Sequence, residues 1–182
     1  HIAALNIVNT AKGTFFLADT LVNNHPSVET LEEIVKLTND SVKIFNVDPV
    51  IAMLSYSNFG ADNTGSPVTV HKAVENLHKN HPEILVDGEM QVNFALDKDL
   101  RSATYPFSKL EGKDVNTLIF PNLSSANITY KTLLSMGLAE NVGPVQMGLK
   151  KPIYVCEPEA SVRDIMNIVT IAVIDAQING KK

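Results

Sequence analysis

The sequence has little cysteine, no surplus of basic charge and no long apolar run, and each shortage excludes a class of protein. The single cysteine, Cys156, rules out an internal disulfide bond and is typical of a reducing compartment, so a cytoplasmic location is expected. The net charge of −5 argues against a nucleic-acid partner, because a nucleic-acid surface needs a basic face. No apolar stretch reaches membrane-spanning length, so no membrane partner is expected either.

The composition is that of a globular protein. With 182 residues, of which 45% are apolar, the chain is long enough to form one domain with a core. It begins at His1 rather than at methionine, and we expect it to be an excerpt of a longer protein.

Strand-like apolar runs alternate with helix-like segments along most of the chain. Strands are expected at 14–22, 49–57, 83–91, 116–120, 143–148 and 152–156, and helices at 28–46, 67–80, 92–102, 122–136 and 161–178. Strands that alternate with helices favour an α/β fold with three layers, in which a mostly parallel sheet carries helices on both faces.

The last expected helix, 161–178, is apolar nearly all round. Its polar side chains form only a narrow stripe, made by Arg163, Asn167, Thr170 and Gln177. Such a helix must be covered on several sides, so we expect it to dock on another domain or subunit. Ser161 and Asp164 have the S-x-x-[DE] spacing of a capping box, which accounts for both residues at the start of the helix.

Two expected strand-to-helix junctions carry hydroxyl and amide groups. Segment 118–127 contains Asn122, Ser124, Ser125 and Asn127, and segment 54–60 contains Ser55 and Ser57. Ligands of open parallel sheets bind at the carboxyl ends of the strands, where helix N-termini also attract anions. A structural interpretation stays open for both junctions, since Asn122 can simply cap its helix. Neither a GxGxxG nor a GxxxxGK[ST] phosphate motif occurs.

Three other groups have simpler structural interpretations. His78 and His81 have a spacing that can bind metal, but no cysteine or carboxylate completes a ligand pattern, so no metal site is predicted. Asp87 and Glu89 alternate along a strand and share a face, as an acid–base pair would, although the Asp-Gly dipeptide also reads as a bend. Cys156 has no neighbouring histidine and precedes a glutamate, which disfavours a nucleophilic thiolate.

Several blocks of the sequence together resemble the phosphotransacetylases. In order, the blocks are "PVIAMLSYSNFG", "VDGEMQVNFALD", "NTLIFPNLSSANITYK", "GPVQMGLKKPI" and "SVRDIMNIVTIAVIDAQ", and they cover the chain from about Thr14 to Gln177. "VDGEMQ" followed by "YPFSKLEGKDVN" is most similar to the phosphotransacetylase-like domain at the end of large bacterial malic enzymes. The resemblance implies a two-lobed domain with an isocitrate/isopropylmalate dehydrogenase-like fold. Residues 1–160 would form its second lobe, and residues 161–182 the terminal helix that returns to the first lobe or to a partner.

The resemblance also implies that the catalytic site is degenerate. Active phosphotransacetylases move an acetyl group between coenzyme A and phosphate without a metal. They carry a Ser-Arg pair before the S-x-x-D segment and another arginine in the helix before the "GP" strand. The corresponding residues here are Glu157, Pro158 and Ser135, while the family aspartate is retained as Asp164. Because guanidinium forks stabilise phosphate and developing oxyanions, little or no acetyl transfer is expected. Another guanidinium beside Asp164 would contradict that expectation.

The malic-enzyme relatives imply a regulatory and oligomerisation role, with acetyl-coenzyme A as the effector and a homo-oligomer as the assembly. No cofactor is expected in this fragment. NAD or NADP and Mg²⁺ or Mn²⁺ would belong to the upstream malic-enzyme region, which oxidatively decarboxylates malate to pyruvate. The alternative is half of an active phosphate acetyl- or butyryltransferase. The residues expected to line the ligand cleft are Ser55, Ser57, Asn122, Asn127, Lys131 and Asp164.

Overall fold

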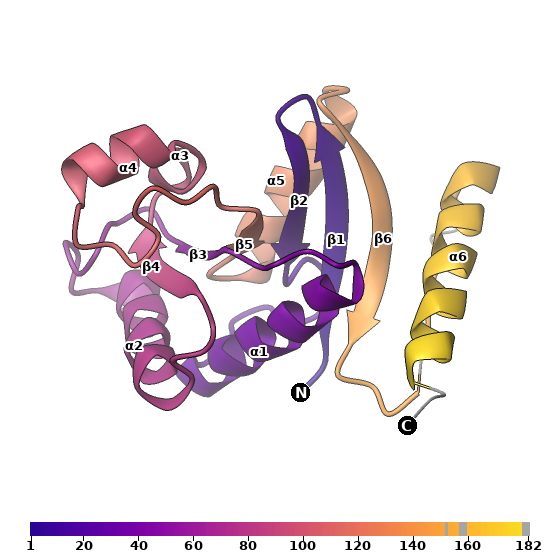
Figure 1. Cartoon of the computed structure of the whole chain (residues 1–182), viewed down its shortest axis with the longest axis horizontal. Coiled ribbons are helices and arrows are strands. Elements are labelled where there is room, and N and C mark those ends of the chain that lie inside the picture. Colours follow the sequence, from indigo (N-terminus) through magenta and orange to yellow (C-terminus); the bar gives the residue numbers. More distant parts are fainter. Residues whose placement is uncertain (152, 157–159, 180–182) are drawn as a thin grey trace.

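A six-stranded mixed sheet forms the centre of the computed structural model, which describes residues 1–151, 153–156 and 160–179 (Figure 1). Its strands are β1 (Ala3–Thr10), β2 (Gly13–Ala18), β3 (Ile51–Leu54), β4 (Val86–Met90), β5 (Thr117–Ile119) and β6 (Ala139–Met147). They lie in the order β4-β3-β5-β2-β1-β6. Strands β4, β3, β5 and β2 run parallel, and β1 is antiparallel to both β2 and β6. The expected α/β fold with a mostly parallel sheet is therefore confirmed.

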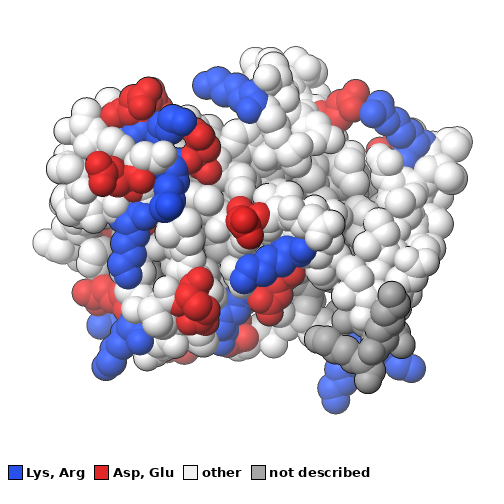
Figure 2. Space-filling view, viewed as in Figure 1, with Lys and Arg blue, Asp and Glu red and all other residues white. Residues whose placement is uncertain are grey.

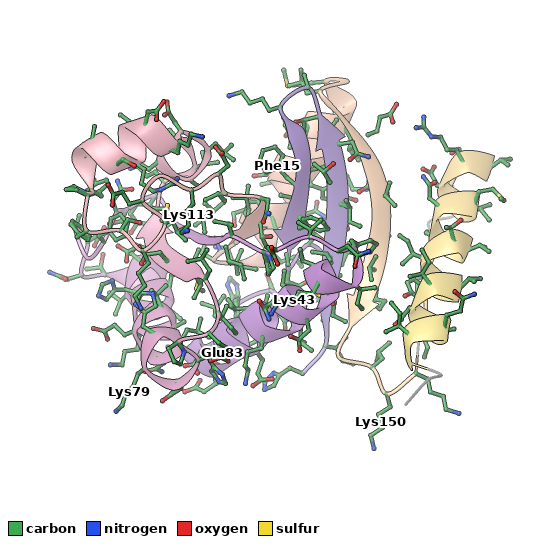
Figure 3. All side chains as sticks on the ribbon, viewed as in Figure 1. Phe15, Lys43, Lys79, Glu83, Lys113 and Lys150 are labelled. Atoms are coloured by element: carbon green, nitrogen blue, oxygen red, sulfur yellow. The ribbon has the colours of Figure 1, made fainter. Side chains whose placement is uncertain are left out.

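The helices lie on both faces of the sheet. They are α1 (Val28–Ile44), α2 (Gly65–Asn80), α3 (Val92–Leu96), α4 (Lys98–Thr104), α5 (Leu123–Ser135) and α6 (Val162–Asn179). Residues of α1 and α2 pack with Ile51 and Met53 in one apolar cluster. Residues of α3 and α5 pack with Ala52 and Leu54 in a second. Phe15 projects from β2 and is partly buried against this second cluster (Figure 3).

Side chains cap the helices where the sequence predicts it. The Ser27 hydroxyl accepts a hydrogen bond from the Thr30 N–H at 3.2 Å, and the Asn122 side chain accepts one from the Ser125 N–H at 2.9 Å. Each bond satisfies one of the free N–H groups at a helix start. Asp97 caps α4 in the same way, and this cap divides the expected helix 92–102 into α3 and α4.

Strand β1 is the element that the sequence analysis missed. It forms a hairpin with β2, in which Leu5 pairs with Ala18 and Thr10 with Gly13. Its sequence, AALNIVNT, mixes alanine and asparagine, which are poor strand formers, with β-branched residues. Asn6 is nevertheless buried there because its side chain donates to Asn141 at 3.1 Å and accepts from Thr20 at 3.1 Å. The strand expected at 152–156 is wrong, since 153–156 form no regular structure; residue 152 lies outside the described part.

Helix α6 lies beside β6 and buries only one side (Figure 1). Ile168 and Ile171 are buried, whereas most of its other apolar side chains are exposed: Val162, Ile165, Met166, Val169, Val173, Ile174 and Ile178. In the view of Figure 2 the surface along this helix is almost uncharged, and charged side chains gather near its ends. What covers this face stays a prediction. Within the described part of the chain, no helix combines the length and the apolar character needed to cross a membrane.

Gly88 lets β4 approach β3 more closely than any residue with a side chain could. It pairs with Met53 at a φ of +146°, and a Cβ atom at this position would lie 2.5 Å from the Met53 carbonyl oxygen. Asp87, the residue before Gly88 on β4, is also held in place, because its carboxylate accepts hydrogen bonds from the Ser108 hydroxyl and the Lys109 N–H, both at 2.7 Å. These two bonds attach segment 108–109 to β4.

We expect Gly88→Ala to destabilise the protein by about 3 kcal/mol or more, since it adds backbone strain to a clash with main chain. The matched control is Gly112→Ala, where φ is +66° but nothing lies within 4 Å of the added Cβ. That substitution should cost only about 1 kcal/mol. Urea denaturation measures both changes, and equal losses would contradict the close packing of β3 on β4.

Candidate functional site

The first candidate site is a cavity of about 560 Å³ at the carboxyl ends of β3, β4 and β5, which we call the strand-end cavity. Ser55, in the segment after β3, and Asn122, in the segment after β5, both line this cavity, so the two predicted junctions lie together. The segment after β4 adds Gln91, whose side-chain amide donates to the Tyr56 carbonyl at 2.6 Å. Phe120 supplies part of an apolar floor. The cavity therefore combines apolar contact with polar groups from three strand ends.

The second candidate site lies where α5, β6 and the start of α6 meet, and we call it the α5–α6 site. One cavity of about 160 Å³ is lined by Lys131, Asn141 and Asp164, among others. An adjoining cavity of about 280 Å³ shares Asn141 and Asp164 and adds Arg163. The site thus holds two cationic side chains, Lys131 and Arg163, and two carboxylates, Asp164 and Glu140. It brings together Lys131 and Asp164, which the sequence analysis placed in one cleft.

The six expected cleft residues do not share one cavity. Asn122 precedes the first residue of α5, and Lys131 follows nine residues later, a rise of roughly 13 Å along the helix. Asn127 is half-buried between them and lines neither site. Ser57 is buried, and its hydroxyl accepts a hydrogen bond from the Asp62 N–H at 3.1 Å, so it organises the loop after β3.

The structure describes only one of the three residues that the resemblance places at degenerate catalytic positions. Ser135 is exposed, ends α5 and lines neither site. Glu157 and Pro158 lie outside the described residues. Ser124 is exposed, and Ser125 lines the strand-end cavity.

Asp164 forms the predicted capping box with Ser161. The Ser161 N–H and hydroxyl donate to Asp164 Oδ2 at 2.9 Å and 2.6 Å, and the Asp164 N–H donates back to the hydroxyl at 3.2 Å. The hydrogen bond from the Ser161 hydroxyl, assisted by its N–H and by the charge of Arg163, lowers the pKa of Asp164. The reciprocal bonds form even though aspartate is shorter than the usual glutamate.

Arg163 lines the same cavity as Asp164, so it is a guanidinium of the kind that the sequence analysis named as contradicting the expected lack of acetyl transfer. Its Nη2 lies 2.8 Å from Glu140 Oε2 and its Nη1 3.3 Å from Glu140 Oε1, so the fork is paired with a carboxylate. Consecutive helix residues point about 100° apart, so adjacency in sequence gave no reason to place both side chains in one cavity. The other arginine, Arg101, is fully buried and donates to main-chain carbonyls, among them that of Phe94 at 2.7 Å.

The two histidines singled out as metal candidates have structural partners. His78 Nε2 is 2.8 Å from the Val86 carbonyl oxygen, which ties α2 to β4, and His81 Nδ1 is 3.3 Å from Glu83 Oε1. Among the described residues, no group of three or more possible metal ligands comes together. Cys156 is exposed.

Asp87 and Glu89 have different surroundings on β4, because the pairing register with β3 shifts after Gly88 and strict alternation does not hold. Asp87 pairs with Ala52 of the second apolar cluster, whereas Glu89 contacts His71 of α2, and both carboxylates are used in packing. Glu89 is fully buried; its carboxylate accepts from the Gly60 N–H at 2.7 Å and lies 2.9 Å from His71 Nδ1. Asp87 holds Ser108, as described above, and its carboxylate is 3.7 Å from His78 Nε2. Neither carboxylate lines the strand-end cavity or the α5–α6 site. The pair organises loops and does not form an acid–base site.

The profile of the phosphate acetyl/butaryl transferase family matches residues 1–173. The chain belongs to this family. It is 40% identical to the NADP-dependent malic enzyme of Escherichia coli (strain K12) over 96% of its own length and 23% of that protein. It is 35% identical to the phosphate acetyltransferase of Clostridium acetobutylicum over 91% of its length and 50% of that protein. The family resemblance expected from the sequence is thus confirmed, and the chain spans only a part of each relative.

Solved structures confirm the fold of this family member. A phosphotransacetylase from Streptococcus pyogenes superposes with a TM-score of 0.88 at 30% identity, covering 100% of this chain and 55% of that one. The EutD phosphotransacetylase from Staphylococcus aureus gives a TM-score of 0.86 at 27% identity, covering 96% and 54%. The chain therefore corresponds to about half of each of these structures.

We expect Asp164→Asn to weaken the start of α6 at pH 7, because it removes a negative charge from the positive end of the helix dipole. The loss should be about 0.5 kcal/mol, since solvent screens this exposed charge. A carboxylate with a lowered folded-state pKa stabilises the protein above its unfolded pKa of about 4 and loses this effect as the pH falls through the folded value. The difference from the parent chain should therefore shrink toward zero in acid. Amide exchange in the first turn of α6 at both pH values measures it.

The control for this substitution is Asp48→Asn, which changes an exposed carboxylate outside any helix cap. It should leave exchange in α6 unchanged at both pH values. If Asp164→Asn altered exchange equally at neutral and acid pH, the ionised cap would not be the cause.

Proposed function

We propose that this chain is the ligand-sensing and assembly part of a larger malic enzyme, and that it recognises acetyl-coenzyme A without transferring the acetyl group. The observation that carries the proposal is the charge pairing at the α5–α6 site. Arg163 is forked onto Glu140, and Asp164 caps α6. Both charged groups therefore already take part in contacts within the chain.

Acetyl transfer needs hydrogen-bond donors aimed at the oxyanion that develops on the thioester carbonyl, and cationic donors are among the groups that can serve. A guanidinium neutralised by a carboxylate gives less stabilisation there, and removing one such donor commonly raises the barrier by about 3 kcal/mol. Glu157, Pro158 and Ser135 stand where active relatives are expected to carry further polar or cationic groups. These residues support recognition without turnover.

Recognition itself needs less than catalysis. Lys131 contributes a positive charge to the wall of the smaller cavity, with its Nζ 5.1 Å from the centre of the Tyr130 ring. Asn141 adds an amide from β6. A polyanionic thioester such as acetyl-coenzyme A would meet this cation through a phosphate. The remainder of its pocket would come from the first lobe.

The wider protein follows from the same proposal. The malic-enzyme region upstream would carry NAD or NADP and Mg²⁺ or Mn²⁺, and would decarboxylate malate in the cytoplasm. The exposed apolar face of α6 would be covered by the first lobe of the same chain or by a second subunit of a homo-oligomer, because an apolar face of this length is unfavourable in water.

The test uses the full-length protein with acetyl-coenzyme A, following binding by calorimetry and malate decarboxylation by absorbance. We expect saturable binding that changes the malate rate, and Lys131→Gln should weaken binding about tenfold by removing one charge-assisted contact. Lys79→Gln is the matched control, since Lys79 lies at the end of α2 and points into solvent (Figure 3). An unchanged malate rate at saturation would remove the regulatory role.

A second assay separates recognition from catalysis. Acetyl phosphate formation from acetyl-coenzyme A and phosphate should stay at background. Robust turnover that Asp164→Ala and Arg163→Lys both abolish would instead establish the alternative, half of an active phosphate acetyl- or butyryltransferase. The position of Arg163 beside Asp164 is the observation that favours this alternative.

A further inference from the structure

The strand-end cavity lies at a point where the chain leaves the sheet in two directions. After β3 the chain passes to α2 on one face of the sheet, and after the neighbouring β5 it passes to α5 on the other face. The two connections diverge and leave a crevice between the carboxyl ends of adjacent parallel strands. Open α/β sheets bind their ligands in such crevices. The cavity of about 560 Å³ occupies this position and has the size of a small-molecule site.

The lining of this cavity selects against charged ligands. No lysine, arginine, histidine, aspartate or glutamate is among its lining residues. The Tyr56 hydroxyl donates to Asp62 Oδ2 at 3.0 Å and is occupied. The Ser125 N–H, which could otherwise hold an anion at the start of α5, already bonds to Asn122. A phosphate or carboxylate would therefore lose its hydration without gaining a cation.

The same lining suits a flat ring with polar edges. Leu54, Val92, Phe120 and Pro121 make an apolar floor, against which a ring can stack. The side chains of Ser66, Asn93 and Thr129 border it, and within the described part of the chain they make no hydrogen bond to another residue. Hydroxyl and amide groups can each donate and accept, as the mixed edge of a nucleobase and the hydroxyls of a ribose require.

We propose that the strand-end cavity is a second binding site, for an uncharged nucleoside-sized ring compound, separate from the α5–α6 site. The two sites are approached from different sides of α5, since Thr129 and Lys131 are about 200° apart around the helix. The proposal does not depend on recognition of acetyl-coenzyme A. Occupation of the crevice would hold the segments after β3, β4 and β5 together.

Adenosine is the probe, titrated into the full chain labelled with ¹⁵N. We expect saturable shifts of the amide signals of Ser55, Gln91 and Ser125, with a dissociation constant at or below about 1 mM. Adenosine monophosphate should bind no more tightly than adenosine, because no cation lines the cavity. The absence of saturable shifts, or a monophosphate that binds more than about tenfold tighter, would overturn the assignment.

Two substitutions on α5 form a matched pair for the same titration. Thr129→Trp fills the cavity and should abolish the shifts, whereas Thr132→Trp places the same ring on an exposed position outside it and should leave them within about twofold. Should Thr129→Trp fail to fold, Asn93→Ala removes one amide from the exposed rim and should weaken binding at least about threefold. Lys131→Gln should not change adenosine binding, which separates this result from failure of the proposed function. Equal adenosine binding by all four variants would contradict the proposed site.

Discussion

The structure depends on the placement of β3 between β4 and β5. All four residues of β3 are buried, so every backbone N–H and C=O of the strand needs a partner from a neighbouring strand. Parallel pairing with β4 and β5 provides these partners and places the carboxyl ends of all three strands at the same end of the sheet. The pairing of β3 with β4 includes the close approach of Gly88 to Met53, which a larger residue would prevent. Because the three strand ends are fixed in this way, the loops that follow them must meet, and a crevice forms.

Helix α5 connects this crevice to the other site. Asn122 fixes its start at the strand-end cavity, and Lys131 and Leu134 in its later turns reach the α5–α6 site. Its buried face, with Ala126 and Tyr130, belongs to the second apolar cluster and holds the helix against the sheet. One rigid element thus determines both the position and the separation of the two sites. A ligand at either end contacts the same helix.

Local signals in the sequence predict much of this arrangement, and tertiary contacts decide the rest. The caps at Ser27, Asn122 and Ser161 follow from hydroxyl, amide and carboxylate groups placed before apolar helices, so they could be read directly. Strand β1 could not, because its alanines and asparagines are stabilised by pairing with β2 in a hairpin and with β6, which is distant in sequence.

The candidate site shows the same division. The two junctions do meet at one cavity, to which they contribute Ser55, Asn122 and Ser125, whereas Ser57, Ser124 and Asn127 do not line it. Placing Lys131 and Asp164 in the same cleft as these residues ignored the length of α5. Arg163 was assigned only to the polar stripe of its helix and not to a site, because its partner, Glu140, lies 23 residues earlier on β6. Side chains that meet through the fold leave no spacing pattern in the chain.

Capping and ligand contact are compatible roles for Asp164. Both hydrogen bonds from Ser161 end on Oδ2, so within the described part of the chain the cap leaves Oδ1 available to a group in the adjoining cavities. The carboxylate is therefore fixed in direction by its structural contact and stays ionised over a wider pH range because its pKa is lowered. In an active transferase this would orient a catalytic group, whereas here the Glu140 carboxylate neutralises the neighbouring Arg163. Under the proposed function, this ion pair is what separates a sensing site from a catalytic one, with the backbone and the cap unchanged.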